Sequence, residues 1–322
     1  MKKMKKKVSY LNIRFLLLFI FFIVFFSKNI YTQTASNYYN LGVSNYYAGK
    51  LDQAIINFTS AIKLNPNDKD SYYNRGLVYA TKGNLNLAIA DFTSALKIAP
   101  QDVESYNNRG STYARQEKYD LAFTDFKHAL KIDPKNADAF SNYGSVYGSL
   151  GKYDTAIIYY NSALKINPKS ALILNNCGIA YASLDKFDTA VIYYNSAIMV
   201  DPKYSDAYNN RGFAYYKQAK YDLAMNDYNY AIDLNQNYAE AYNNRGLLYT
   251  YRNNTDLAIA DFTRAIKINS KYAKAFCNRG IVYEGQRKSD LATADYNAAI
   301  KINPKFSDPL YKLSHLMYYF KF

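Results

Sequence analysis

Histidine, cysteine and tryptophan are almost absent from this chain, which has two histidines, two cysteines and no tryptophan in 322 residues. His128 and His315 lie far apart in the sequence, and neither is close to Cys177 or Cys277. The side chains that most often form nucleophile–base pairs and metal sites are therefore not grouped. A glycine-rich phosphate-binding loop is absent as well. We expect no enzyme activity, no metal site and no cofactor.

Glycine and proline are also scarce, with 13 and 7 residues, but eight of the glycines recur at a strict spacing of 34 residues. A strict period without insertions predicts one supersecondary unit stacked many times rather than separate globular domains. With each of these glycines at position 8, repeats one to eight cover 35–68, 69–102, 103–136, 137–170, 171–204, 205–238, 239–272 and 273–306. The pieces outside are 1–34 and 307–322.

Each repeat reads as two helices joined by a turn. In repeat three, Tyr106, Gly110 and Tyr113 recur near helical spacing. Asp120 follows the turn, where we expect it to cap a second helix that stops at Pro134. Gln236 and Ser270 replace that proline in repeats six and seven, so we expect their second helices to end less abruptly.

Small residues mark where the two helices should meet. Alanine stands at positions 20 and 27 of all eight repeats, and Phe or Tyr stands at position 24. Glycine costs roughly 1 kcal/mol relative to alanine inside a helix, so a close helix–helix approach must offset this cost. This pattern, with an aromatic at position 4, tyrosine at position 11 and proline at position 32, resembles the tetratricopeptide repeat. The resemblance covers 35–306 and implies an all-α, right-handed superhelix of helix pairs.

Arginine at position 7 is unusual for that family, and it varies together with the residue at position 23. Five repeats combine arginine at position 7 with aspartate at position 23, and the other three have neither. If each arginine is paired instead with position 23 of the preceding or following repeat, the correspondence between arginine and aspartate is lost. The sequence therefore predicts ion pairs inside each repeat. The alternative is a solvent-facing arginine that binds ligand. The pairs are Arg75–Asp91, Arg109–Asp125, Arg211–Asp227, Arg245–Asp261 and Arg279–Asp295.

Asparagine stands at position 6 of every repeat, while its neighbours vary. The resemblance places position 6 on the concave face, and the row is similar to the asparagine ladder of O-linked N-acetylglucosamine transferases, which holds an extended peptide. An amide can donate and accept together, so it can bind peptide backbone of any sequence. The alternative is that these asparagines bond a neighbouring helix or were merely inherited with the duplicated repeat. The candidate peptide-binding residues are Asn40, Asn74, Asn108, Asn142, Asn176, Asn210, Asn244 and Asn278.

Other partners fit less well. The lysine and asparagine pattern by which co-chaperones of this family hold a terminal carboxylate is missing at positions 5 and 9. Seven bases and no acid lie within 1–35, which leaves half of the formal charge of +14 for the remaining chain. Charges of both signs alternate within the repeats, so we expect no nucleic-acid face. A protein or extended peptide is the expected partner.

The two ends carry their own signals. The basic start KKMKKK precedes twelve apolar residues, Phe15–Phe26, which is the order of a signal peptide, with an uncleaved membrane anchor as the alternative. Both place the repeats outside the cytoplasm. Residues 307–322 continue the register as a capping helix, and their surplus of apolar side chains predicts either self-association or a plain cap.

The cysteines lie three repeats apart, too far for an internal disulfide. We expect Cys177 to be a small core residue and Cys277 to face the groove and be reactive. The resulting prediction is an exported scaffold that binds a protein or peptide in its asparagine-lined groove. The alternatives are a structural component of the cell envelope that acts through its convex face or ends, and a regulatory lid on another enzyme.

Overall fold

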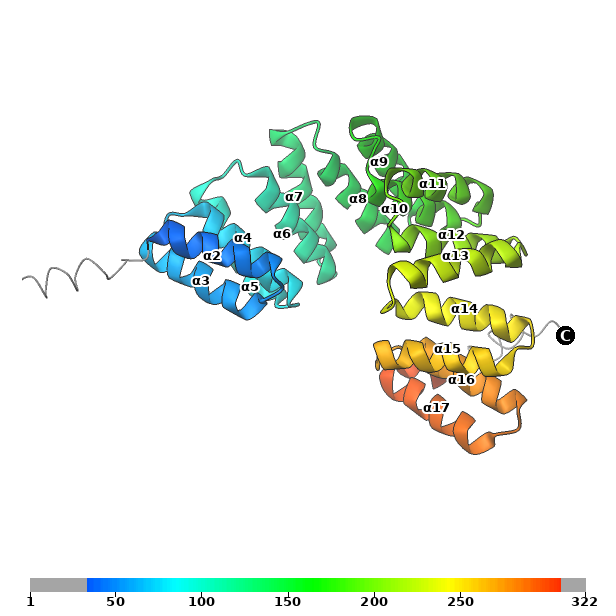
Figure 1. Ribbon diagram of the computed structural model, residues 1–322. Helices are drawn as coiled ribbons and strands as arrows, with labels where there is room; N and C mark the ends of the chain where they lie inside the picture. Colours follow the sequence, from blue (N-terminus) through cyan, green and yellow to red (C-terminus); the bar gives the residue numbers. More distant parts are fainter. Residues whose placement is uncertain (1–33, 308–322) are drawn as a thin grey trace, which may run out of the picture. The chain divides into compact units, whose positions relative to one another are not determined.

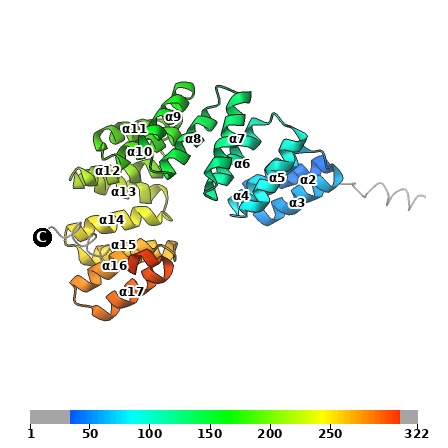
Figure 2. The ribbon, with the colours of Figure 1, turned by 180° about the vertical axis from the view of Figure 1, so that it is seen from behind.

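The computed structural model describes residues 34–307, and in this range it contains sixteen α-helices and no strand. Each repeat holds one pair of antiparallel neighbours, a first helix of 13 residues and a second of 14 (Figure 1; Figure 2 shows the pairs from behind). The all-α repeat architecture is confirmed. The predicted leader and the predicted capping helix lie almost wholly outside the described residues.

The first four pairs are α2 (Ala35–Tyr47) with α3 (Leu51–Leu64), α4 (Lys69–Thr81) with α5 (Leu85–Ile98), α6 (Val103–Arg115) with α7 (Tyr119–Ile132), and α8 (Ala137–Ser149) with α9 (Tyr153–Ile166). The next four are α10 (Ala171–Ser183) with α11 (Phe187–Val200), α12 (Ser205–Lys217) with α13 (Tyr221–Leu234), α14 (Ala239–Tyr251) with α15 (Thr255–Ile268), and α16 (Ala273–Gly285) with α17 (Ser289–Ile302). A short 3₁₀ turn, η1, covers Pro304–Ser307.

The helix pairs form two compact bodies. The N-terminal body ends at Ile132 and holds repeats one to three, whereas the C-terminal body begins at Asp133 and holds repeats four to eight. Inside each body, every second helix contacts the first helix of the next repeat, and neighbouring first helices also touch. No helix within residues 34–307 is long and apolar enough to cross a membrane.

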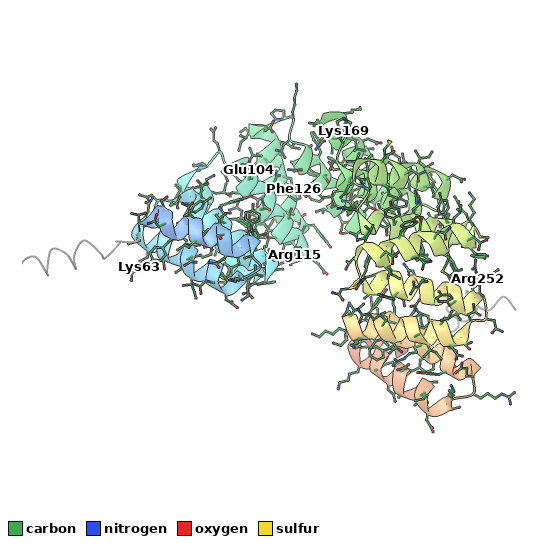
Figure 3. The ribbon with its side chains drawn as sticks, viewed as in Figure 1. Lys63, Glu104, Arg115, Phe126, Lys169 and Arg252 are labelled. Carbon is green, nitrogen blue, oxygen red and sulfur yellow. The ribbon has the colours of Figure 1, made fainter. Side chains whose placement is uncertain are left out.

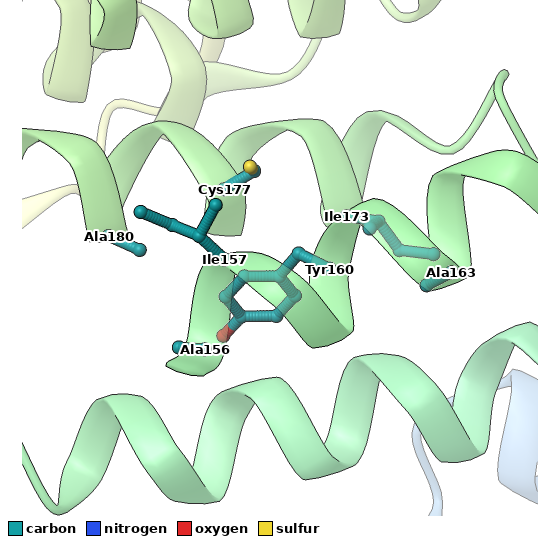
Figure 4. Packing of buried hydrophobic residues seen from close by; sticks show 7 residues of the cluster. All are labelled: Ala156, Ile157, Tyr160, Ala163, Ile173, Cys177 and Ala180. Atoms are coloured by element: carbon teal, nitrogen blue, oxygen red, sulfur yellow. The ribbon is translucent and has the colours of Figure 1, made fainter. Parts of the chain in front are cut away.

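The glycine at position 8 lies where the two helices of a repeat come closest. A Cβ added to Gly110 would lie 2.5 Å from Cε1 of Phe126, the position-24 ring that Figure 3 labels. The alanines at positions 20 and 27 are buried in every repeat. Figure 4 shows this packing in repeat four, where the ring of Tyr160 lies among Ala156 and Ala163 of its own helix and Cys177 of the next repeat. The close approach predicted from the glycines is therefore confirmed.

Two predictions about helix ends are wrong. Asp120 does not cap a helix: α7 begins one residue earlier, at Tyr119, and aspartate or asparagine occupies the first turn of each second helix. There a carboxylate stabilises the helix through the dipole. The second helices of repeats six and seven end at the same position as the others, at Leu234 and Ile268. The reason is the next residue: Asn235 and Asn269 are extended, and each side-chain Oδ1 accepts the backbone N–H two residues on, so an Asx turn ends the helix without proline.

Candidate peptide-binding site on the first helices

The arginines at position 7 bind the aspartates of their own repeats, which is the pairing expected from the sequence. In all five repeats, Nε and Nη2 of arginine donate to the two carboxylate oxygens over 2.6–2.8 Å. The aspartate side chains are only 5–8% exposed. In repeat seven, the hydrogen bonds to Asp261 raise the pKa of Arg245 above its ordinary value, although burial opposes the charge. This bidentate geometry fixes the first helix on the second.

Each of these arginines also reaches the preceding repeat, which the sequence did not reveal. Its Nη1 donates over 2.6–3.0 Å to the residue at position 25 of the previous second helix, which is Thr59, Thr93, Asn195, Asn229 or Thr263. The guanidinium also lies near the aromatic rings at positions 4 and 11, as Arg211 does near Tyr208 and Tyr215. The group therefore links three helices and is directed into the protein.

Asparagine at position 6 makes a bond that spans two repeats in five of the eight places. Its Nδ2 donates to the residue at position 5 of the previous repeat. In the N-terminal body that acceptor is a tyrosine hydroxyl: Asn74 bonds Tyr39 over 3.3 Å, and Asn108 bonds Tyr73 over 3.1 Å. The same Nδ2 atoms donate to backbone carbonyls one helical turn earlier, over 2.9 Å.

In the C-terminal body the acceptors are themselves amides, and the bonds join into a chain. Nδ2 of Asn278 donates to Asn243 over 2.8 Å, and Asn244 donates to Asn209 and Asn210 to Asn175, each over 3.0 Å. Longer contacts of 3.5 Å connect Asn243 to Asn244 and Asn209 to Asn210. The position-5 asparagines are only 3–5% exposed. Burial of these amides is therefore compensated by partners in the neighbouring repeat.

Asn176 differs from this pattern. The residue at position 5 of the previous repeat, where the acceptor stands elsewhere, is Ser141, and within residues 34–307 the structure records no inter-repeat hydrogen bond for the Asn176 amide. The side chain is half-buried, whereas Asn278, the last asparagine of the row, is only 4% exposed. Asn40 is exposed and Asn142 half-buried. The eight asparagines are thus chemically unequal, although the sequence presents them as identical.

A recess of ≈ 310 Å³ opens in repeats five and six, and Asn210 is the position-6 asparagine in its lining. Ile179, one turn after Asn176 on α10, contributes to its lining, and Asn210 and Phe213 contribute from α12. Ile179 and Phe213 are each 40% exposed. Lys217 brings a positive charge, with Nζ 5.9 Å from the ring centroids of both Phe187 and Phe213. The volume lies at the lower end of the range for ligand pockets.

The two cysteines are both buried. Cys177 is fully enclosed, and burial raises the pKa of its thiol to about 12, in line with the predicted core residue. The prediction of a groove-facing, reactive Cys277 is wrong, because this residue is only 3% exposed and packs with Ala273 and Ile281. A buried thiol on an apolar cluster is a poor nucleophile.

Comparison with known proteins identifies the family. Models of the tetratricopeptide repeat match residues 39–103, 102–169 and 136–203, and each of 205–238, 239–272 and 273–306. The chain therefore belongs to the tetratricopeptide repeat family. A search of curated proteins finds no match.

Solved structures agree in fold. The chain is similar to a tetratricopeptide repeat protein of Parabacteroides merdae (22% identity, TM-score 0.60, covering 81% of this chain and 99% of that one). It also resembles a thermophilic repeat protein of Thermus thermophilus, with 25% identity and a TM-score of 0.51, covering 56% of this chain and 98% of that one.

A chain of the APC/C hetero-tetramer Cut9–Hcn1 matches over 86% of this chain, with 17% identity and a TM-score of 0.67, and this chain spans about half (55%) of its length. These similarities show the fold alone. Repeat proteins of this family typically serve as non-catalytic scaffolds for protein–protein interaction, and the fold supports that general role here.

Proposed function

We propose that this chain is an exported scaffold that holds an extended segment of another protein on the concave side of its repeats. The observation that carries the proposal is the recess lined by Ile179 and Phe213, which begins one helical turn after Asn176 on α10. An amide that has no inter-repeat bond among the described residues can donate to and accept from a peptide backbone, while the recess takes an apolar side chain of the same segment.

The hydrogen bonds divide the asparagine row into two roles. Asn210 and Asn244 use their Nδ2 atoms to join repeats, so they offer a peptide mainly their carbonyl oxygens. Asn278 also joins repeats, and it is buried. Asn176 offers both groups. The peptide contact is therefore centred on repeats five and six, where position 9 is also apolar and exposed.

Binding of an immobilised library of random peptides tests this centre. We expect the double variant Asn176→Ala, Phe213→Ser of the full chain to lose at least tenfold in affinity, about 1.4 kcal/mol. Ser162→Ala, on the second helix α9, is the matched control and should bind as the parent does. Equal binding by all three proteins would contradict a peptide site on the first helices.

Export rests on the sequence of residues 1–34 and has its own test. We expect these residues to carry a reporter that is active only outside the cytoplasm, and Leu17→Arg, which interrupts the apolar run, to abolish the reporter activity. An active reporter with Leu17→Arg would contradict an export signal in this segment.

A second candidate function is an envelope component that acts through its outer face. One specific observation favours it: every second helix exposes at least one aliphatic side chain near its N-terminal half. These are Ile56, Leu87 and Leu121 in the N-terminal body and Ile158, Ile192, Leu223, Leu257 and Leu291 in the C-terminal body, all 46–64% exposed.

A further inference from the structure

The outer face of α11 in repeat five exposes large apolar side chains. Ile192 is 63% exposed, and Met199, two turns later, is 78% exposed. Six of the other repeats have lysine at the position of Met199, and repeat six has Asp233. A charged side chain is therefore the rule at this exposed position, and repeat five departs from it.

An open cavity adjoins this face. It measures ≈ 650 Å³ and is lined by Leu174, Ser196, Met199 and Val200, with Pro168 and Lys169 on the turn between α9 and α10. Figure 3 labels Lys169 on this turn. The surface can thus accept a protruding apolar side chain next to Met199, rather than presenting a smooth wall.

The residues along this face are ordered so that it can match a second copy of the same face running in the opposite direction. Asp188 lies at the start of α11, Ile192 follows one turn later, Ser196 occupies the middle, and Met199 and Lys203 lie at and beyond the end. Placed antiparallel across a two-fold axis near Ser196, one copy would set Ile192 against Met199 of the other, and Asp188 against Lys203. Such a patch that matches itself is the requirement for an isologous dimer.

We propose that the α11 face docks a second copy of this chain in antiparallel orientation. Charge complementarity at both ends selects the orientation, since parallel helices would place Asp188 beside Asp188 and Lys203 beside Lys203. The small Ser196 at the axis permits close approach, and the Met199 cavity receives Ile192. The cavity of this surface shares no lining residue with the recess of the proposed peptide site.

Helix α9 of repeat four provides a matched control. It carries the same Asp154, Ile158 and Ser162 at equivalent positions, and Ile158 is 64% exposed. Its final turn carries Lys165 in place of methionine, so an antiparallel copy would set an aliphatic side chain against a charge. Exposure of the isoleucine is equal in the two helices, and only the complementarity differs.

Cysteine cross-linking of the full chain in mild detergent tests the register. Ile192 and Met199 are seven residues apart, roughly 10 Å along the helix, so Ile192→Cys should not cross-link to itself across the axis. A mixture of Ile192→Cys and Met199→Cys chains that carry different tags should give a mixed covalent dimer, at least tenfold above either homodimer. Ile158→Cys mixed with Lys165→Cys should not. The buried native cysteines serve as background in all samples.

Sedimentation velocity on the same protein gives the second readout. Met199→Lys, which installs the residue that most repeats use, should fold normally by circular dichroism and raise the dimer dissociation constant at least tenfold. Homodimers as abundant as the mixed dimer, or an unchanged dissociation constant with Met199→Lys, would overturn the proposal. Loss of the dimer on removal of 308–322 alone would assign self-association to the tail instead.

Discussion

Repeats four and five hold their helices together differently from the five arginine repeats. Where an arginine repeat has a bidentate ion pair, repeat four stacks Tyr143 on Tyr159, with ring centroids 4.9 Å apart and an interplanar angle of 11°. In repeat five, Tyr181 stacks on Tyr193 with centroids 5.2 Å apart. The Oη of Tyr193 then donates to Asn161 over 3.3 Å, at position 25 of the previous repeat. That is the position to which the guanidinium donates elsewhere.

The same contact between helices can thus be made with two chemistries that differ in their tolerance to substitution. A buried ion pair leaves an uncompensated charge when one partner is lost. A pair of stacked rings leaves a cavity and, at most, one unpaired hydroxyl. We therefore expect the arginine repeats to respond more strongly to single substitutions than repeats four and five do.

The largest effect is expected for Arg109→Ala. This change strands Asp125, which is only 3% exposed, and should cost about 3 kcal/mol or more in local stability. Hydrogen exchange of the α6 and α7 amides measures the loss locally, since a repeat array need not unfold in one step. The double variant Arg109→Leu, Asp125→Leu should recover most of it. A loss below about 1 kcal/mol for Arg109→Ala would mean that the pair behaves like a surface pair.

A smaller loss is expected for Asn210→Ala, because it leaves the buried Oδ1 of Asn175 without its donor. The cost of such an unpaired group is about 1–3 kcal/mol. Asn176→Ala is the control, since it breaks no inter-repeat amide bond recorded within 34–307 and alanine is the better helix former. Thermal unfolding and exchange of α10 and α12 should separate the two variants. Equal losses would show that the Asn176 amide is also structural.

The sequence predicts contacts within a repeat better than contacts between repeats. The partner of Arg109 could be found because Asp125 varies with it, and the role of Gly110 because a glycine inside a helix needs a reason. Thr93, the second partner of Arg109, gave no such signal, since threonine is common on exposed helix faces.

The amide chain was hidden for a related reason. Asparagine at position 6 never varies, so it cannot covary with the residue at position 5, which is tyrosine in repeats one and two and asparagine in repeats five to seven. Which amide meets which acceptor depends on how far one repeat is rotated against the next, and a single repeat does not encode that rotation. Helix starts were missed because aspartate stabilises both a cap and a first turn.

Tyr193→Phe tests the aromatic alternative at the hydrogen bond from Tyr193 to Asn161. The stacked pair with Tyr181 remains, so we expect a loss of only about 1 kcal/mol, the net value of a typical hydrogen bond. Exchange of the α9 and α11 amides provides the measurement. Arg211→Ala in repeat six is the reference variant and should lose clearly more local stability. An equal loss for Tyr193→Phe would contradict the expectation that the aromatic repeats tolerate single substitutions better.

The smallest effects are expected in the turns between the two helices of a repeat, where position 15 is left-handed in all eight repeats. Three repeats have glycine there, and five force another residue into this conformation, for example Ala219 with φ of 57°. A side chain in this region costs on the order of 1 kcal/mol relative to glycine. We therefore expect Ala219→Gly to stabilise repeat six by up to about 1 kcal/mol.

The reverse change, Gly83→Ala, should cost a similar amount in repeat two, where φ is 81° and an added Cβ would meet no atom within 4 Å. A steric clash is thus excluded at Gly83, so the strain of the left-handed backbone is the cause of the expected loss. Denaturation midpoints of the two variants should move in opposite directions, and a destabilised Ala219→Gly protein would show that flexibility lost in folding outweighs the strain.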